Sequence, residues 1–205
     1  MDTLRIGIFG GTFDPIHNSH VQIALSVMKK YNLHKVIFVI SYLPPHKKGQ
    51  VQTSFTHRYK MVNIAVSKTK NFEASDIEKN LKGTSYTIRA LKHFKKTYPD
   101  SQLYFIIGSD SLSELPTWRD LRGILEIAEI ITYPRKNTPC WETPELLHTA
   151  GEEGIKKLKK GQLKAELFDI SSTEIRSRLK SGKSVRKLVP YSVWKYLKEN
   201  PRIYK

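Results

Sequence analysis

The chain has little of three things that often set the class of a protein: cysteine, long apolar runs and acidic residues. Cys140 is the single cysteine among 205 residues, which excludes an intrachain disulfide and fits a reducing compartment. No run approaches the roughly 18 apolar residues that a membrane span needs. The N-terminus also has no apolar stretch after basic residues, as a secretory signal would. We therefore expect a cytoplasmic protein without a membrane partner.

Acidic side chains are outnumbered by basic ones. Asp and Glu total 19 against 35 Lys and Arg, which gives a formal net charge of +16. Such a balance fits either a nucleic-acid-binding protein or a protein that handles small polyanions. The cations form only short clusters, without a long basic tail or a repeated aromatic–basic pattern. This distribution favours small polyanions, and a basic nucleic-acid-binding module is the alternative of a different class.

Apolar runs that suit buried strands alternate with segments of helical spacing along most of the chain. This alternation predicts an α/β fold with a Rossmann-like, doubly wound parallel sheet. We expect one domain over 1–205, with a small C-terminal helical portion from about 171 to 205. The pattern weakens over 134–161, which we interpret as a surface excursion, and 136–164 carries no resemblance to a known motif. The expected strands are 6–9, 35–40, 72–75, 103–107, part of 127–132, and 167–170; the expected helices are 21–30, 55–67, 87–98, 118–125, one from 171 and one after Pro190.

The most informative segment follows the first expected strand and runs from Gly10 to His20, with the sequence Gly-Gly-Thr-Phe-Asp-Pro-Ile-His-Asn-Ser-His. A glycine turn lets the backbone approach an anion, and a helix N-terminus adds free N–H groups and a partial positive charge. His17 and His20 are three residues apart, so both can face one bound group. The segment has neither a P-loop ending nor a Gly-x-Gly-x-x-Gly pattern. A zinc site of these histidines with Asp14 lacks a third clear ligand, so we expect no protein metal site.

Histidines at such a turn can donate hydrogen bonds to phosphate oxygens where charge builds up during transfer of a nucleotidyl group. The segment resembles the His-x-Gly-His signature of the nucleotidyltransferase α/β-phosphodiesterase superfamily. Its Gly-Gly-Thr-Phe-Asp-Pro-x-His part resembles the bacterial nicotinate-nucleotide adenylyltransferases of that superfamily. One departure is Ser19, which stands where the family has glycine and leaves the fine geometry of the phosphate pocket open.

A second motif, Ile-Ser-Ser-Thr-Glu-Ile-Arg, occupies 170–176. Ser171 and Glu174 have the spacing of a helix capping box. Hydroxyls and N–H groups at a helix start, with Arg176 one turn in, also suit the phosphates of ATP. The residues alone do not choose between the two interpretations, but the motif resembles the superfamily's Ile-Ser-Ser-Thr-x-Ile-Arg, which contacts the triphosphate. The resemblance implies an ATP site of Gly10, Gly11, Thr12, Phe13, Gly108, Asp110, Ser171, Ser172, Thr173 and Arg176.

Two further stretches concern the second substrate. Trp118 ends a Leu-Pro-x-Trp stretch that resembles the family's, where the tryptophan packs on the pyridine ring; a generic buried tryptophan is the plainer interpretation. Ser85-Tyr86-Thr87 caps a helix and resembles the family's Ser-Tyr-Thr, which helps bind nicotinate. N–H donors there would favour a carboxylate over an amide. The resemblance implies a pyridine-nucleotide site of Asp14, Thr84, Tyr86, Thr87, Trp118, Arg119 and Arg135.

These motifs together predict an enzyme that transfers the adenylyl group of ATP to nicotinate mononucleotide, giving nicotinate adenine dinucleotide and pyrophosphate. The resemblance implies His17, His20 and Lys47 as catalytic residues, and Mg²⁺ held largely by phosphates and water. An enzyme that prefers nicotinamide mononucleotide, or another transferase of the superfamily, is the nearer alternative. ATP and nicotinate mononucleotide are the expected partners, nucleic acid is not favoured, and homo-oligomer formation stays open.

Overall fold

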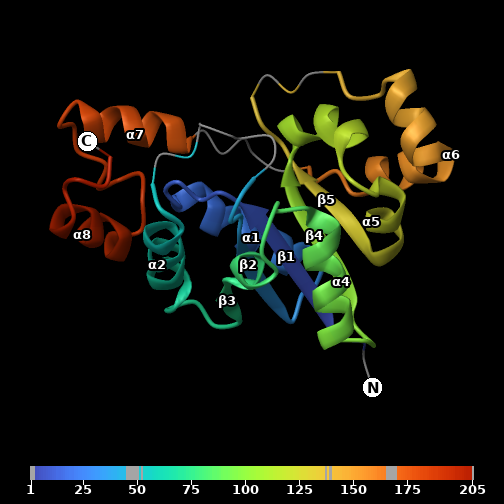
Figure 1. Cartoon of the computed structure of the whole chain (residues 1–205), viewed down its shortest axis with the longest axis horizontal. Coiled ribbons are helices and arrows are strands. Elements are labelled where there is room, and N and C mark those ends of the chain that lie inside the picture. Colours follow the sequence, from blue (N-terminus) through green and yellow to red (C-terminus); the bar gives the residue numbers. More distant parts are fainter. Residues whose placement is uncertain are drawn as a thin grey trace.

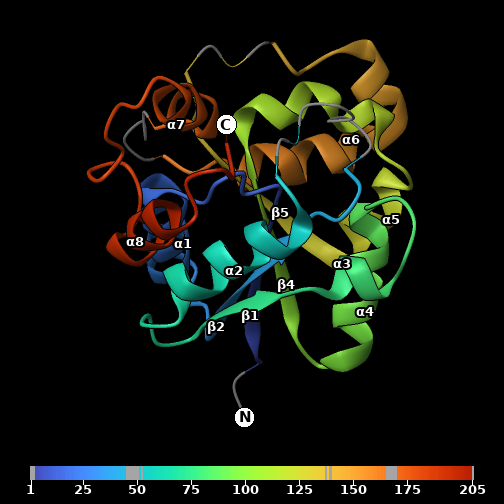
Figure 2. The same ribbon diagram turned by 60° about the vertical axis from the view of Figure 1, so that its left-hand side comes forward.

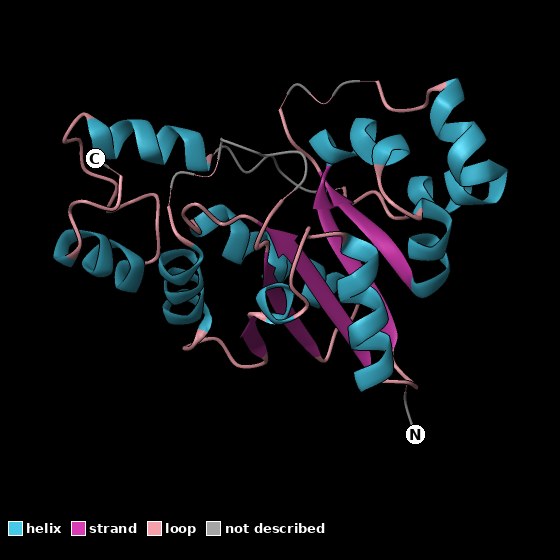
Figure 3. Cartoon of the chain, in the orientation of Figure 1, coloured by secondary structure: helices cyan, strands magenta, loops and turns pink. Residues whose placement is uncertain are grey.

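The computed structural model describes residues 3–44, 51, 53–136, 138, 140–164 and 170–204 (Figure 1). Five parallel strands form one sheet in the order β3-β2-β1-β4-β5, with helices on both faces (Figure 3). Within the described ranges, no helix is both long and apolar enough to cross a membrane. The elements are β1 (Arg5–Gly11), α1 (Asn18–Lys30), β2 (Lys35–Ile40), α2 (Phe55–Val66), β3 (Phe72–Ser75), α3 (Ile77–Asn80), α4 (Thr87–Thr97), β4 (Gln102–Gly108), the 3₁₀ helix η2 (Ser109–Thr117), α5 (Leu121–Ile127), β5 (Ala128–Tyr133), α6 (Pro144–Lys160), α7 (Ser172–Lys180) and α8 (Tyr191–Glu199).

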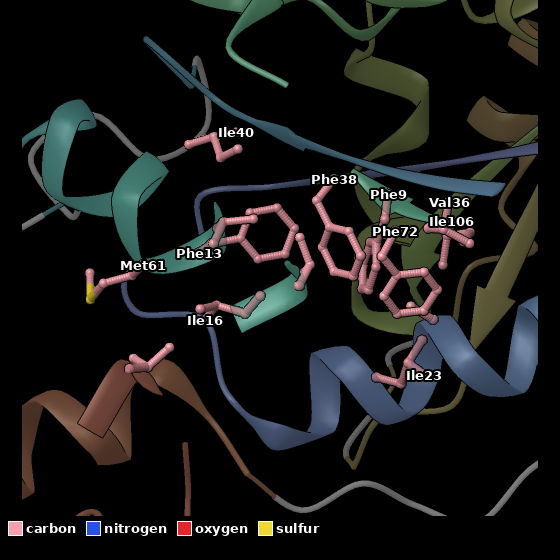
Figure 4. Close-up of a cluster of buried hydrophobic side chains, with 14 of the residues drawn as sticks. Phe9, Phe13, Ile16, Ile23, Val36, Phe38, Ile40, Met61, Phe72 and Ile106 are labelled. Atoms are coloured by element: carbon pink, nitrogen blue, oxygen red, sulfur yellow. The ribbon is translucent and has the colours of Figure 1, made fainter. Parts of the chain in front are cut away.

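The central strands are buried on both faces, which explains their nearly continuous apolar sequences. On one face, Phe9, Phe38 and Ile106 belong to a core that also contains side chains of α1, α2, α7 and α8 (Figure 4). On the other face, Ile8 and Phe105 belong to a second core with side chains of α4, α5 and α6. Figures 1 and 2 show these two helical layers on either side of the sheet.

The strand order places a crevice beside β1. Its neighbours β2 and β4 are reached by connections that run to opposite sides, so the carboxyl ends of β1 and β4 border the topological switch point. Open parallel sheets bind their ligands at this place. Gly10 and Gly11 end β1 there, and Gly108 ends β4.

The predicted fold class is confirmed, and two local predictions are wrong. The helix expected over 118–125 begins only at Leu121, because Trp118 has an extended backbone (φ −75°, ψ 133°) and the Asp120 carboxylate caps the helix by accepting from the Gly123 N–H. The segment interpreted as a surface excursion contains α6, which buries Leu146 and Leu158. The strand expected over 167–170 falls almost entirely on residues outside the described ranges.

Helix α6 ends where its backbone meets β5. Thr132 donates its N–H to the Gly161 carbonyl at 3.0 Å, and Leu163 donates to the Thr132 carbonyl at 2.8 Å. A Cβ at Gly161 would collide with the Ile130 carbonyl oxygen. The close approach of two backbones therefore requires glycine at this position.

We expect Gly161→Ala to lower the free energy of unfolding by about 2 kcal/mol, because backbone rather than a flexible side chain must move. Urea unfolding followed by circular dichroism measures this change. The neighbouring exposed substitution Lys160→Ala is the control and should stay within about 0.5 kcal/mol of the parent. Equal effects of the two substitutions would contradict the steric explanation.

Candidate active site

A cavity of about 640 Å³ opens at the switch point. The ends of β1 and β4 and the starts of α4 and α7 all contribute to its wall. Two predicted site residues, His17 and Thr84, do not line the cavity. A further one, Lys47, lies outside the described residues. The predicted residues that do line it are Gly10, Gly11, Thr12, Phe13, Asp14, His20, Tyr86, Thr87, Gly108, Asp110, Trp118, Arg119, Arg135, Ser171, Ser172, Thr173 and Arg176.

The two histidines form a stacked pair with different exposure to the cavity. Their ring centroids are 3.6 Å apart; His20 lines the cavity, whereas His17 is only 1% exposed. The His17 backbone N–H donates to Nδ1 of His20 at 3.2 Å. Because Nδ1 accepts this bond, a neutral His20 ring carries its proton on Nε2, which is then the donor nitrogen.

His17 is held in its neutral form. Burial, assisted by the charge of Arg135, lowers its pKa to about 3. Neither ring nitrogen has a hydrogen-bond partner among the described residues. An unsatisfied buried polar group beside a cavity is often completed by a ligand. The His17 ring does not line the cavity but stacks on His20, which does. Direct contact of His17 with a phosphate therefore stays a prediction.

The N-terminus of α1 is covered by protein. Asn18 donates its backbone N–H to the Leu188 carbonyl and its side-chain amide to the Lys187 carbonyl, both at 3.0 Å. The positive end of the helix therefore acts on the cavity mainly through its field and through His20. Ser19, in the family's glycine position, is 2% exposed and helical without a positive φ, so serine fits there in an ordinary conformation.

Phe13 links the glycine turn to the histidine pair. Its φ of 49° is left-handed, which is strained for a bulky residue. Its ring packs edge-on against Phe9 and His20, with centroids 5.6 and 5.0 Å away, and this packing holds the strained turn. A Cβ at Gly11 would approach the Phe13 ring to 2.9 Å. The missing side chain of Gly11 thus makes room for an aromatic ring.

The second predicted motif packs directly on the first. Ser172 donates its hydroxyl to the Pro15 carbonyl, and Arg176 donates Nη1 to the Asp14 carbonyl, both at 2.9 Å and across 157 and 162 residues of chain. Ser171 caps α7 by accepting from the Glu174 N–H at 3.1 Å. The predicted cap at Ser171 is confirmed, and the ATP-site interpretation, which is compatible with it, stays a prediction.

The start of α7 presents two backbone donors at the cavity wall. No described residue accepts a hydrogen bond from the N–H groups of Ser172 and Thr173, which are too early in the helix to find an intrahelical acceptor. The guanidinium of Arg176 also donates Nη2 to the Thr173 hydroxyl at 3.2 Å. Together these groups can bind an anion.

The wall beyond β4 carries a second guanidinium. Arg135 donates Nη2 to the Tyr133 hydroxyl at 3.1 Å, and its Nε is 4.0 Å from Oδ1 of Asp110. Its backbone N–H donates to the Ser109 hydroxyl at 2.8 Å. A Cβ at Gly108 would collide with Oδ1 of Asp110, so this half-exposed carboxylate would have to move to accommodate a larger residue.

A planar platform lies on the remaining side. Trp118 is half-buried, packs edge-on against Phe105 with centroids 6.0 Å apart, and has no described partner for its Nε1–H. The guanidinium of Arg119 lies 5.0 Å from the ring centroid of Tyr86. Thr84 accepts from the Tyr86 N–H at 2.9 Å and from Arg89 at 3.2 Å, so it shapes the turn behind the cavity.

Three supporting residues escaped the sequence prediction: Arg58, Glu78 and Tyr204. Arg58 is 2% exposed and donates Nη1 to the carbonyls of Thr12 and Ser41 at 2.9 and 2.7 Å. Its position three and four residues before two apolar side chains of α2 was a signal that it faces the core.

Burial raises the pKa of Glu78, which lines the cavity and accepts from the Tyr42 N–H at 3.1 Å.

The described part of the chain contains no group of three or more His, Cys, Asp or Glu side chains that could hold a metal ion. A divalent cation at this site would therefore need oxygen ligands from elsewhere, such as phosphates and water. The donors of the cavity wall are cationic side chains, a histidine and backbone N–H groups, which suit anions rather than cations.

Comparisons with known proteins show the family and the fold of the chain. A cytidylyltransferase-like family model matches residues 8–178. A probable nicotinate-nucleotide adenylyltransferase of Clostridium botulinum is 40% identical, over 97% of this chain and 98% of that protein. One from Desulfitobacterium hafniense is 42% identical, over 95% and 93%. The fold is similar to that of nicotinic acid mononucleotide adenylyltransferase from Plasmodium falciparum, solved in complex with NaAD (TM-score 0.73, 22% identity, 98% and 97% coverage).

We expect the ring of His17 to remain neutral between pH 8 and pH 5, because its folded pKa is about 3. In the unfolded chain the ring takes up a proton near pH 6.5. The stabilisation from the neutral ring is therefore complete above pH 6.5 and declines by about 1.4 kcal/mol per pH unit below it, until about pH 3. The ring proton shifts of His17 in NMR spectra measure the titration. A midpoint above pH 5.5 would contradict the burial of this ring.

Proposed function

The chain belongs to the cytidylyltransferase-like family and, within it, to the nicotinate-nucleotide adenylyltransferases; on this premise we propose that it transfers the adenylyl group of ATP to nicotinate mononucleotide. The products are nicotinate adenine dinucleotide and pyrophosphate. One structural observation supports this assignment above the others. The turn before the histidines and the start of α7, far apart in sequence, are hydrogen-bonded into one anion-binding wall.

The reaction that we propose needs no covalent intermediate. A phosphate oxygen of nicotinate mononucleotide attacks the α-phosphorus of ATP, forming one P–O bond. The bond between the α-phosphorus and the bridging oxygen breaks, and its electrons leave with pyrophosphate. The nucleophile is already an anion, so no general base is required, and the enzyme contributes position and electrostatic stabilisation.

His20 is the catalytic residue best placed for this task. Its Nδ1 accepts a backbone hydrogen bond, which leaves Nε2–H to donate to an oxygen of the α-phosphate as charge develops there. We propose that His17 supports the orientation of this ring by stacking on it. Lys47, outside the described residues, remains a proposed second clamp on the reacting phosphate.

The two substrates would occupy opposite parts of the cavity. The N–H groups of Ser172 and Thr173 and the guanidinium of Arg176 would hold the leaving pyrophosphate. Gly108 and Asp110 would face the adenosine. Mg²⁺ would enter with ATP and screen the negative charge of its triphosphate, bound mainly by phosphate oxygens and water.

On the other side, Trp118 would stack on the pyridine ring. The N–H of Thr87 at the start of α4 would donate to the nicotinate carboxylate. Donors of this kind favour a carboxylate and gain nothing from the NH₂ of an amide. The same preference distinguishes this proposal from an enzyme that prefers nicotinamide mononucleotide.

We also assign the whole chain to one catalytic domain, because residues 12–15 and 172–176 jointly build the wall. The single cysteine, Cys140, is exposed and forms no disulfide, and we propose the cytoplasm as the place of action.

A pyrophosphate-release assay with ATP and either mononucleotide tests the function. We expect kcat/KM to be on the order of tenfold or more higher for the acid than for the amide. His20→Ala should lower turnover about 100-fold while the protein stays folded, because a donor to the developing charge is lost. His148→Ala, at an exposed position on α6, is the matched control. If neither mononucleotide supports pyrophosphate release and the protein binds a short duplex in a salt-sensitive way, the nucleic-acid-binding alternative would be favoured.

Substitution of Trp118 by alanine should raise KM for nicotinate mononucleotide about tenfold and leave KM for ATP within about twofold, because the stacking surface of one substrate is lost. Steady-state kinetics with each substrate varied in turn measures the two constants. Trp118→Phe keeps a planar ring and should recover most of the loss. Equal increases in both KM values would contradict the stacking role.

A further inference from the structure

The turn that carries the site is held by side chains from other parts of the chain. Residues 12–15 include the strained Phe13, and their carbonyls accept hydrogen bonds from three donors. Arg58 donates to Thr12, Arg176 to Asp14 and Ser172 to Pro15, each at 2.9 Å. These bonds fix the backbone of the turn, whereas the side-chain carboxylate of Asp14 bonds to a different partner.

Asp14 is 2% exposed and is one of the residues that line the cavity. Its Oδ1 accepts a hydrogen bond of 2.8 Å from the hydroxyl of Tyr204, which is 190 residues away in sequence and follows α8. Tyr204 is itself 5% exposed. Burial and the nearby carboxylate raise the pKa of Tyr204, so its hydroxyl keeps the proton that it donates.

We propose that Tyr204 is a positioning residue for adenylyl transfer, acting through Asp14 on the turn that leads to the two histidines. The residue does not line the cavity, so it touches neither substrate. Its hydroxyl fixes the carboxylate in the middle of the turn, next to the left-handed Phe13 whose ring packs against His20. This inference rests on the proposed function of the cavity.

The expected consequence of losing this hydroxyl is misplacement of His20. Removing the donor leaves a buried carboxylate short of one partner, and a shift of the turn would let the carboxylate regain a partner or water. Enzymes are sensitive to such shifts, since about 1 Å of misplacement can reduce the rate about 100-fold. A partial shift at a turn held by three other bonds should act on kcat more than on either KM.

The test compares Tyr204→Phe with Tyr196→Phe, a matched control. The Tyr196 hydroxyl also forms a short bond, 2.7 Å to Nδ1 of His57, but it contacts neither the turn nor the cavity. We expect Tyr204→Phe to lower kcat about tenfold with KM values within about twofold, and Tyr196→Phe to leave kcat within about twofold. Melting temperatures measured for both proteins separate a loss of stability from a loss of rate.

A double-mutant cycle tests the route through Asp14. If Tyr204 acts through this carboxylate, Tyr204→Phe should cost no further kcat in an Asp14→Ala background. Asp14→Asn retains an oxygen that can accept from Tyr204 and should lose less kcat than Asp14→Ala, a comparison that stands even where Tyr204→Phe folds poorly. Additive losses, or equal kcat in Tyr204→Phe and the parent, would overturn the proposal. Absence of pyrophosphate release by the parent enzyme would instead overturn the proposed function.

Discussion

The active-site wall depends on the hydrogen bonds between residues 12–15 and the start of α7. The carbonyls of this turn lie outside the regular helices and strands, so they need donors from distant parts of the chain. Ser172 and Arg176 supply two of them, while Ser172 and Thr173 at the same helix start also line the cavity. One helix terminus therefore shapes the turn, and we propose that it also binds the ligand beside it.

In the histidine pair, different burial gives two chemically identical side chains different properties. The inner ring is desolvated and neutral, and the outer ring faces the cavity with its tautomer set by a backbone N–H. A neutral imidazole can donate a hydrogen bond without proton transfer. This suits a reaction in which negative charge moves from one phosphate oxygen to another and no proton must be taken up.

The sequence was sufficient to predict the elements with strong periodicity and to place the motifs at the ends of strands. Helix α6 was missed because Thr143 and Pro144, its cap and first residue, lie in a stretch of prolines and charges that resembles a loop. Trp118 was placed in a helix because the later start of α5, after its cap Asp120, depends on a left-handed backbone that local patterns do not show. The partners of the Asp14 carboxylate and of the Arg58 guanidinium depend on tertiary contacts between distant segments, which local patterns do not encode.

The span of these contacts along the chain has a consequence for folding and inactivation. The sheet needs only residues up to Tyr133, whereas the ties to the turn close loops of 157 to 190 residues. Such closures are entropically costly and form late. A nascent chain that has folded through β5 would have a complete sheet and an unfinished wall. In the mature protein, local opening of α7 and α8 would abolish activity before the sheet unfolds, so loss of activity would report the detachment of two small helices rather than global melting.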